Sequence, residues 1–363
     1  MITKFQNKAI TANMVVLPSK EVDFMEEASN YAFSENQMKK LKKVMGFGTR
    51  RISIPGETVS EYAIFGIKQM IADGIIKEKE VGAIIVATTS PDQFIPPVSN
   101  IIQGAFDFDL DTVCIDISQG CCGFVVGLTY ALMTAEHLEG KKVLLVAGDM
   151  LTQRVSTRDR ASRPICGDGV AISVIENVEN GQTIYASLKN MGKECFAVQI
   201  PAGGTKIPIT PETIEEKQDE FGNWRGLQHL VMEGDKVFNI IINETPIVME
   251  ELLKYAGKDI TDIEYFICHQ SSVFTLKKLA QRLGVNQSIM PNNIVPKYGN
   301  SSSATIPVTL MDHHDEIFAE KDERLVMFAA FGTGMALGAI MMNLKKLDYC
   351  KMIEYPHKNV NQG

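Results

Sequence analysis

The sequence lacks three features: a C-x-x-C pair, a secretory leader, and a long uncharged apolar run. Its seven cysteines are an odd number, and no positively charged start is followed by an apolar segment and a cleavage site. These absences predict reduced thiols and a cytoplasmic protein. Because no uncharged apolar run reaches the ~18 residues that a membrane span needs, we also expect no membrane span.

An excess of charge is missing too. The formal net charge is -8 over 363 residues, 22% of the residues are charged and 45% are hydrophobic. This composition is close to that of an average globular protein, so it argues against a disordered chain and against a nucleic-acid surface. The length exceeds that of a usual single core, which predicts two domains or one large layered domain.

Apolar runs bounded by glycine or proline alternate with longer helical patterns. The clearest strands are expected at 81–90, 112–118, 142–150, 171–176, 263–270 and 324–332. Helices are expected at 58–74, 123–138, 235–256 and 272–283. The strands are almost continuously hydrophobic, as in strands covered on both faces, so the pattern predicts an α/β architecture with buried sheets.

The chain shows a weak sign of duplication. Each half contains strand, helix and strand, with a small-residue turn opening one helix, QGCCGF in the first half and GNSSSA in the second. Chance similarity of α/β units is the alternative. A duplication would divide the chain into 1–178 and 179–363, because the stretch ENVENGQ near 176–182 has turn composition. Residues 201–228 are expected to form an inserted surface loop and residues 346–363 a loose tail.

Two adjacent cysteines, Cys121 and Cys122, stand between glycines in DISQGCCGF, just before an apolar helical pattern. A thiol at a helix start lies near unpaired N–H groups and the positive end of the helix dipole, which lower its pKa from about 8.5 toward neutrality. Either cysteine is therefore a candidate nucleophile. The alternative is that both are small packing residues at the start of a buried helix.

Three further stretches place polar groups at strand and helix ends. His269 lies at the carboxyl edge of the strand pattern 263–270, where open α/β sheets hold ligand and catalytic groups, although a structural histidine is the alternative. Asn300 lies in YGNSSSATIP, where asparagine also serves as a turn former or helix cap. The turn at 332–334, GTG, follows a buried strand. The few residues after it leave no room for a nucleotide-binding βαβ unit, so we expect it to present backbone N–H groups to an oxyanion.

Cysteine, histidine, asparagine and a glycine turn in this order resemble the thiolase superfamily, and specifically the β-ketoacyl-acyl carrier protein synthase III family. The resemblance covers nearly the whole chain, and it depends on the order and spacing of many motifs. They are PGETVS, IIVATTSPDQFIPP, DISQGCCGF, TRDRASRPICGDGVA, MEGDKVFN, CHQ, YGNSSSA and FGTGMALG. The family pattern D-x-x-x-x-C-x-G-F assigns the nucleophile to Cys121 and leaves Cys122 as a packing residue.

The resemblance implies a five-layer αβαβα fold of two related halves with the site between them. It also implies a two-stage decarboxylative Claisen condensation. Cys121 accepts an acyl group from a thioester. His269 Nε2–H and the amide of Asn300 then donate to the enolate oxygen of a malonyl thioester. The backbone N–H groups of Cys121 and Thr333 form the second oxyanion hole. No metal and no cofactor are implied beyond the substrates, which are acyl-coenzyme A, acyl carrier protein thioesters, or both.

Two more positions take a role from the resemblance. Arg160 matches an arginine that lies against the adenine of coenzyme A, and Phe94 of one chain would close the acyl pocket of a partner chain in a homodimer. Other positions depart from the family: Lys40 stands where many members have a tryptophan, Val44 replaces an arginine, and Phe274 replaces the arginine that docks an acidic carrier protein. These departures predict a divergent paralogue that serves a dedicated lipid, polysaccharide or secondary-metabolite pathway.

Two rival functions stay open at this point. One is an acyltransferase of the same fold, which passes the acyl group of Cys121 to a hydroxyl or amine. Such members tend to replace the asparagine by an acid, so Asn300 favours condensation. The other is a non-catalytic subunit that pairs with an active homologue. Such subunits commonly lose one site residue, whereas this chain keeps Cys121, His269 and Asn300.

Overall fold

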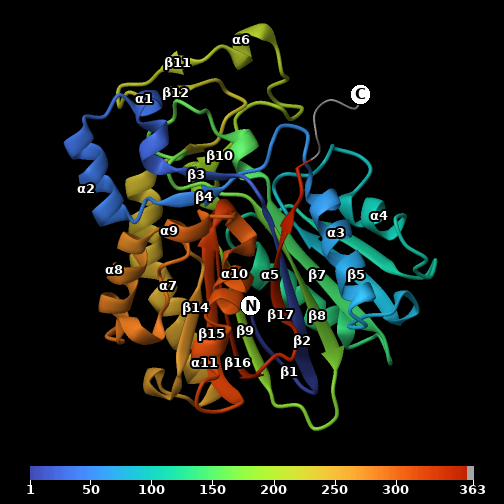
Figure 1. The fold of residues 1–363 in the computed structure, drawn as a ribbon. Coiled ribbons are helices and arrows are strands. Elements are labelled where there is room, and N and C mark those ends of the chain that lie inside the picture. Colours follow the sequence, from blue (N-terminus) through green and yellow to red (C-terminus); the bar gives the residue numbers. More distant parts are fainter. Residues whose placement is uncertain (358–363) are drawn as a thin grey trace.

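The computed structural model describes residues 1–357, which form two central β-sheets flanked and separated by helices (Figure 1). The first sheet has six strands in the order β17-β2-β8-β7-β5-β6. Their bounds are β2 (Lys8–Pro18), β5 (Val81–Ala87), β6 (Val113–Ile117), β7 (Lys142–Asp149), β8 (Gly169–Asn177) and β17 (Cys350–Tyr355). β8 runs antiparallel to β2 and β7, whereas β7, β5 and β6 are parallel to one another.

The second sheet has five strands in the order β1-β9-β16-β15-β14. Their bounds are β1 (Ile2–Phe5), β9 (Ile184–Asn190), β14 (Tyr265–Cys268), β15 (Glu323–Gly332) and β16 (Ala336–Lys345). β16 runs antiparallel to β9 and β15, and β15 is parallel to β14. All six strands predicted from continuous apolar runs are therefore present, four in the first sheet and two in the second.

The two sheets repeat one strand order. Side by side in space, the strands of the first half run β2-β8-β7-β5 and those of the second half run β9-β16-β15-β14. In both series the first strand of the half lies next to its last strand, and the pairs are antiparallel, antiparallel and parallel. The predicted boundary at 178/179 falls in the connection between β8 and β9. Each sheet also contains one strand from the opposite end of the chain. The C-terminal strand β17 pairs with β2 in the first sheet, and the N-terminal strand β1 pairs with β9 in the second.

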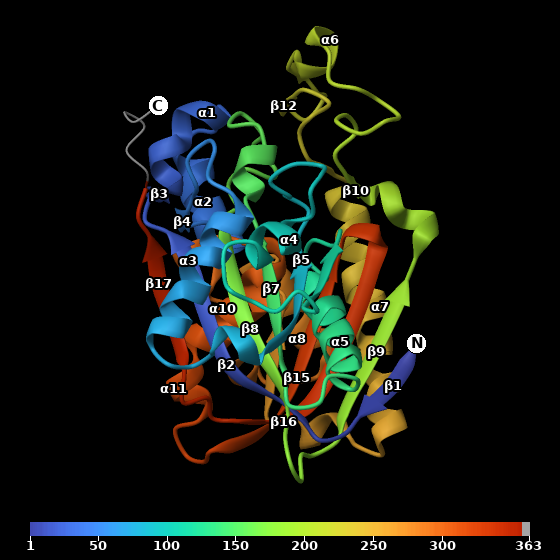
Figure 2. The same cartoon turned by 90° about the vertical axis from the view of Figure 1, so that its right-hand side faces the viewer.

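Helices complete five layers. α3 and α4 cover the outer face of the first sheet, α5 and α10 lie between the two sheets, and α7 and α8 cover the outer face of the second (Figures 1 and 2). Their bounds are α3 (Val59–Ala72), α4 (Val98–Gln103), α5 (Gly123–Ala135), α7 (Gly234–Ala256), α8 (Val273–Leu283) and α10 (Thr305–Asp312). Three apolar clusters fill the spaces between these layers. The fold is the thiolase-like αβαβα arrangement of two related halves.

The central helix α5 shows why the sequence forms this layer. Its sequence, GFVVGLTYALMTA, is apolar on almost every side, because one face packs on β5 and β7 and the other on β15 and β16. A helix that is hydrophobic all round is stable only when it is enclosed. Gly127 allows the close approach to the first sheet, since a Cβ at this position would lie 2.6 Å from a methyl group of Leu145.

Most of the remaining elements form a cap over one end of the two sheets (Figure 1). They are β3 (Glu21–Asp23), α1 (Ala28–Tyr31), α2 (Glu35–Met45), β4 (Thr49–Arg51), β10 (Val198–Gln199), α6 (Pro211–Ile214), β11 (Lys217–Gln218), β12 (Trp224–Arg225), β13 (Val231–Met232) and α9 (Val295–Tyr298). The short helix α11 (His314–Ile317) lies at the other end, next to the start of β15 (Figure 1). The predicted insert 201–228 projects from the body and carries α6, β11 and β12. It is anchored by Arg225, whose Nε lies 2.6 Å from the buried carboxylate of Asp159.

Two fold predictions are wrong. The tail was expected to be loose over 346–363, but residues 350–355 form β17, which pairs in parallel with β2 and stacks Tyr355 on Tyr62 at 4.2 Å. Residues 358–363 of that prediction lie outside the described part of the chain. The strands were also expected to be covered on both faces, but β6 lies at a sheet edge and leaves Val113 and Ile115 exposed in the single chain.

Within residues 1–357, no helix combines the length and the apolar character that crossing a membrane requires. The seven cysteines all lie in this part of the chain, and each is a free thiol.

Candidate active site

The predicted site residues meet where loops leave the ends of the two sheets. Cys121 lies in the turn between β6 and the start of α5, and His269 directly follows β14. Asn300 lies in the turn that leads to α10, and Thr333 directly follows β15. Because parallel strands end at the same edge of a sheet, this topology brings groups from both halves to one place between the central helices.

Ser302 links three of these groups by direct contacts. Its hydroxyl lies 4.0 Å from Cys121 Sγ, and its backbone N–H donates to Asn300 Oδ1 at 2.9 Å. Its carbonyl accepts from the Thr305 hydroxyl at 3.0 Å, and Thr305 Oγ1 in turn lies 2.7 Å from His269 Nδ1. The structure therefore brings Cys121, His269 and Asn300 into one connected cluster.

Cys121 is partly exposed and lies just before the first residue of α5. The sequence analysis expects the helix start to lower its pKa toward neutrality, but burial, together with the nearby carboxylate of Asp149, raises the pKa of the thiol to about 11. Desolvation and a like charge both disfavour a thiolate. At neutral pH the resting group is consequently the thiol, and the expectation of a pre-formed thiolate is wrong.

Cys122 differs from Cys121 in its surroundings. Its side chain is fully buried in the apolar cluster between the two sheets, and its Sγ contacts the carbonyl of Ala330 at 3.6 Å. Burial raises the pKa of this thiol further than that of Cys121. Such a thiol is inert and packs as a small apolar residue.

His269 is a neutral imidazole. Only 1% of its surface is exposed, the edge of its ring faces Phe331, and burial lowers its pKa to about 3. This value lies far below neutral pH, so the ring holds one proton and offers one N–H donor. A neutral donor next to the nucleophile suits the stabilisation of a developing negative charge.

Asn300 is held by its backbone and by its side-chain oxygen. Its N–H donates to the carbonyl of Ile165 at 2.8 Å, and its own carbonyl accepts from the N–H of Gly167 at 3.0 Å. Because Asn300 Oδ1 accepts from Ser302 N–H, only the oxygen of the amide can occupy that side. The amide nitrogen is thereby turned away from Ser302 with its two N–H donors.

The turn after β15 presses against the nucleophile. A Cβ built on Gly332 would lie 2.4 Å from the Cβ of Cys121, so only glycine fits there. The Thr333 hydroxyl accepts from the N–H of Gly120 at 3.1 Å, and the Gln119 amide donates to the Thr333 carbonyl at 2.5 Å. The two turns that carry the predicted oxyanion donors, Cys121 and Thr333, are therefore joined to each other.

The other predicted residues lie away from this cluster. Arg160 stacks its guanidinium on the ring of Phe33 at 3.9 Å. An aromatic ring therefore lies beside Arg160, although Lys40, which stands where many family members have a tryptophan, is exposed on α2. Val44 is exposed on the same helix. Phe94 is 83% exposed.

Phe274, the position that departs from the family's docking arginine, stacks on Phe238 at 5.6 Å. Both rings are partly exposed, and the ammonium group of Lys278 lies 5.9 Å from the Phe274 ring. An apolar pair with a nearby cation therefore stands where an arginine was expected.

Three residues of the cluster were not predicted from the sequence: Ser302, Thr305 and Asp149. The first two lie within the quoted motif YGNSSSATIP, but residue type alone does not show which hydroxyl faces the site. Asp149 is the last residue but one of the predicted strand 142–150, and a charged residue at the carboxyl end of a buried strand is a signal that could have identified it.

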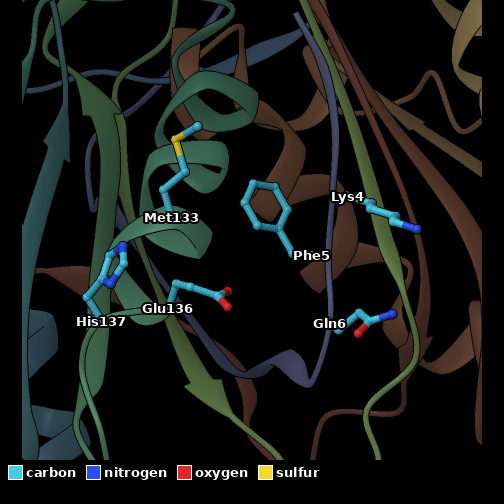
Figure 3. A pocket seen from close by; sticks show the side chains of 6 residues that line it. All are labelled: Lys4, Phe5, Gln6, Met133, Glu136 and His137. Carbon is cyan, nitrogen blue, oxygen red and sulfur yellow. The ribbon is translucent and has the colours of Figure 1, made fainter.

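A large hollow elsewhere on the molecule does not belong to this site. It has a volume of about 520 Å³ and is lined by Lys4, Phe5 and Gln6 of the first strand segment and by Met133, Glu136 and His137 at the end of α5 (Figure 3). Cys121 lies at the opposite end of α5, so the hollow and the cysteine are separated by the length of that helix.

Two family models match the chain. The model described as "3-Oxoacyl-[acyl-carrier-protein (ACP)] synthase III" matches residues 115–192, which include the nucleophile turn, and its C-terminal counterpart matches residues 253–344, which include His269, Asn300 and Thr333. A candidate 3-oxoacyl-[acyl-carrier-protein] synthase 3 of Campylobacter jejuni is 28% identical over 355 residues, covering 97% of this chain and 98% of the relative. The β-ketoacyl-[acyl-carrier-protein] synthase III of Caldanaerobacter subterraneus is 28% identical over 302 residues, covering 83% and 88%.

Solved structures of related enzymes have the same fold. The crystal structure of a 3-oxoacyl-(acyl-carrier protein) synthase from Burkholderia xenovorans superposes with a TM-score of 0.89 at 22% identity, covering 98% of this chain and 99% of that chain. The fold is thus that of the thiolase superfamily, and the family models and relatives indicate a condensing enzyme. Within that superfamily, the chain is a β-ketoacyl-acyl carrier protein synthase III-like member.

Proposed function

We propose that the protein forms a β-ketoacyl thioester in two stages. In the first, Cys121 takes an acyl group from coenzyme A or from an acyl carrier protein. In the second, a malonyl thioester loses carbon dioxide, and the resulting carbanion attacks the acyl group on Cys121. The bond between the acyl carbon and Cys121 Sγ then breaks and frees the cysteine.

The observation that carries the proposal is a pair of uncharged donors in the cluster that contains the nucleophile. Burial keeps His269 neutral, and the contact from Ser302 N–H turns the Asn300 amide nitrogen away from Ser302. Decarboxylation places negative charge on the thioester oxygen, and a preorganised donor is worth roughly 3 to 4 kcal/mol at such an oxygen. Decarboxylation needs donors to this oxygen and no base, so two neutral donors fit it.

The proposed chemistry needs no cofactor apart from its thioester substrates. Exchange of an acyl group between two thioesters is nearly isoenergetic, so an activated thiol is sufficient for the first stage. In the second stage the electrons of the broken C–C bond supply the carbanion. The backbone N–H groups of Cys121 and Thr333 would serve the tetrahedral intermediate on the acylated cysteine.

Intact-protein mass spectrometry tests the first stage. The protein is incubated with a panel of acyl-coenzyme A and acyl carrier protein thioesters, and the added mass identifies the donor that acylates Cys121. Release of labelled carbon dioxide from a malonyl thioester tests the second stage. Transfer of the acyl group to an added alcohol or amine without release of carbon dioxide would make the protein an acyltransferase. A chain that acquires no acyl group from any donor would fit a non-catalytic partner subunit.

The carrier surface supports a role in a dedicated pathway. The exposed pair Phe274 and Phe238 beside Lys278 offers apolar contact and one cation where related enzymes are expected to use an arginine. A Phe274→Ala variant should raise the KM for acyl or malonyl groups on the cognate carrier and leave the KM for the coenzyme A thioester unchanged. Phe221→Ala, which removes a ring that is 73% exposed on the insert, is the matched control.

The proposal includes a homodimer through the first half. Phe94 and Ile95 are 83% and 82% exposed, and the nearby edge strand β6 has unpaired backbone groups and exposed Val113 and Ile115. An exposed apolar sheet edge favours pairing with another chain. Light scattering should give twice the mass of the 363-residue chain, and Phe94→Asp should shift the protein toward monomer while Phe221→Asp should not. A monomeric wild-type protein at micromolar concentration would refute the dimer.

The cytoplasmic location stays a prediction.

A further inference from the structure

Asp149 is a buried carboxylate close to the nucleophile. It is fully buried at the end of β7. Its Oδ1 accepts four hydrogen bonds from residues that follow β5: from the Thr88 hydroxyl, from the N–H and hydroxyl of Thr89, and from the Ser90 hydroxyl. Among residues 1–357, no basic side chain lies within ion-pair distance of it. A buried charge without a counter-ion is costly, so this group calls for a role beyond anchoring a loop.

The second oxygen of Asp149 lies at the end of the strand on which the turn 302–304 packs, because residues of that turn contact β7. Oδ2 is buried and makes no hydrogen bond of good geometry within the described chain, yet the Ser302 hydroxyl lies close enough to lower the pKa of the carboxyl. The same hydroxyl is the group that lies 4.0 Å from Cys121 Sγ. The order of groups is therefore thiol, hydroxyl, carboxylate, with Ser302 in the middle.

The backbone holds Ser302 in this position. Its φ is +57°, in the left-handed region that serine rarely adopts. The hydrogen bond from its N–H to Asn300 Oδ1 and the one from the Thr305 hydroxyl to its carbonyl fix this conformation. Strained backbone of this kind persists where surrounding structure demands it, and it is concentrated at functional sites.

We propose that Ser302 and Asp149 together accept the proton of Cys121 when the cysteine is acylated, an inference that rests on the acyl transfer proposed above. Cys121 S–H gives its proton to Ser302 Oγ as the Ser302 proton passes to Asp149 Oδ2. The thiolate attacks the thioester carbonyl, and the bond from the acyl carbon to the carrier sulfur breaks. The leaving thiolate then takes the proton back from Asp149, so the carboxylate is restored and the carrier departs as a thiol.

The alternative acceptor in the site is His269, and its environment opposes that role. Its low pKa makes it a weak base, and its Nδ1 contacts the Thr305 hydroxyl. Two titratable groups lie close enough to the thiol to affect it, Asp149 from β7 and Cys122 at the helix start, whereas His269 reaches it only through Thr305 and Ser302. The carboxylate of Asp149 raises the pKa of Cys121, as a like charge beside a thiolate should. They are therefore coupled, with one negative charge and one proton between them.

This coupling has a pH signature that can be measured without any acyl substrate. Alkylation of Cys121 by iodoacetamide reports the thiolate and is followed by peptide mass spectrometry. In the wild type, moving the proton from Cys121 to Asp149 changes no proton count. The alkylation rate should therefore have a level part just above the pKa of Asp149, before loss of the second proton to solvent adds a tenfold rise per pH unit. In Asp149→Asn the proton must leave to solvent, and the rate should rise tenfold per pH unit up to the thiol pKa.

Ser302→Ala tests the bridge and keeps the buried carboxylate in place. It should lower the level part of the alkylation profile about tenfold, because the hydrogen bond to the forming thiolate is lost. Ser303→Ala is the matched control: it removes a neighbouring buried hydroxyl that donates to the carbonyl of Ala87 at 3.1 Å, and it should reproduce the wild-type profile. If Asp149→Asn does not fold, Ser302→Ala decides the question.

Two results would overturn the inference. One is a wild-type rate that rises tenfold per pH unit with no level part, as in Asp149→Asn, which would make Asp149 a structural anchor. The other is a Ser302→Ala profile identical to that of the wild type. Because iodoacetamide needs neither an acyl donor nor a malonyl thioester, these results are independent of whether the proposed condensation takes place.

Discussion

The two halves of the molecule bring equivalent segments to the site and fill them with different chemistry. The end of β5 leads to Thr88 in the first half, and the end of β14 leads to His269 in the second. The turn before the central helix holds Cys121 in the first half and Asn300 in the second. In the first half β7, which pairs in parallel with β5, ends at Asp149. Its counterpart β15, which pairs in parallel with β14, ends in the glycine turn.

The difference teaches how a repeated scaffold divides one reaction. The first half contributes a thiol and a carboxylate, the two groups whose charge changes in the proposed acyl transfer. The second half contributes a neutral imidazole, an amide and a backbone turn, which keep their charge and are proposed to act on a negative oxygen. Contacts through Ser302 join the two sets. Substitutions on the two sides of the site should therefore affect different stages of the reaction.

The largest expected effect is in the first half. Cys121→Ala should abolish acyl-enzyme formation completely while the thermal unfolding temperature changes little, because the change removes one partly exposed sulfur atom. Cys122→Ala should keep acylation and lower stability instead, since its sulfur packs in the core. Intact mass after exposure to an acyl thioester measures the first effect and calorimetry the second. If the two variants exchanged these behaviours, the nucleophile would be Cys122.

The second prediction concerns the other half of the site. His269→Ala and Asn300→Ala should still acquire the acyl group, about 2- to 5-fold more slowly, since neither is the proposed proton acceptor. Each should reduce decarboxylation of a malonyl thioester on the order of 10² to 10³, the scale for removing one preorganised donor. The double variant should lose little more than either single variant, because both donors act on one oxygen.

Single-turnover measurements separate the two stages, with mass for acylation and labelled carbon dioxide for decarboxylation. The matched control is Gln270→Ala, next to His269, whose amide donates to the carbonyls of Cys268 and Pro291. It should affect stability more than either stage. If His269→Ala stopped acylation and left decarboxylation intact, His269 would be the base for Cys121, and the division between the halves would be wrong.

The sequence was sufficient for the buried framework and insufficient for its edges. Strands such as 81–87 and 142–149 are continuous apolar runs that local pattern identifies, because both of their faces are covered. β17 was missed because its sequence, CKMIEY, mixes charge with apolar residues, and its partner β2 lies at the other end of the chain. Pairing between distant segments cannot be derived from local composition.

The site shows the same division. Cys121, His269 and Asn300 were identified because polar residues at strand and helix ends are visible in the sequence and because they match a family pattern. The pKa of the thiol was not, because it depends on burial and on Asp149, which reaches the thiol only in the folded chain. The contact of Ser302 with Cys121 also crosses the two halves, so no spacing in the sequence encodes it.

The third prediction sharpens the role of the second half through Thr305. Its single hydroxyl proton has two acceptors, the carbonyl of Ser302 and Nδ1 of His269. In the structure the hydroxyl donates to the Ser302 carbonyl, so the proposed enolate donor requires it to turn toward Nδ1, which leaves the ring proton on Nε2. Thr305→Val should therefore reduce decarboxylation by about tenfold, the value of one hydrogen bond of about 1.4 kcal/mol, and leave acylation unchanged. Thr305→Ser keeps the hydroxyl and should restore the rate. Equal losses in both variants would indicate a packing role only.

The smallest expected effect is at the turn that joins the halves. The Thr333 hydroxyl anchors the N–H of Gly120, but the oxyanion donors proposed for this turn are backbone groups, which a side-chain change leaves in place. Thr333→Gly should therefore change the acylation rate with a short acyl thioester by less than about fivefold. The hydrogen bond that is lost, from Gly120 N–H to the threonine hydroxyl, is worth about 1 kcal/mol or less. We expect the threonine side chain to narrow the space beside Cys121, so the same variant should accept longer acyl groups more readily than the wild type. Competition between short and long acyl thioesters, resolved by the mass added to Cys121, measures this preference. A loss of a hundredfold or more with the short substrate would show that the threonine hydroxyl itself serves the reaction, and the second half would then supply a side-chain donor at this turn as well.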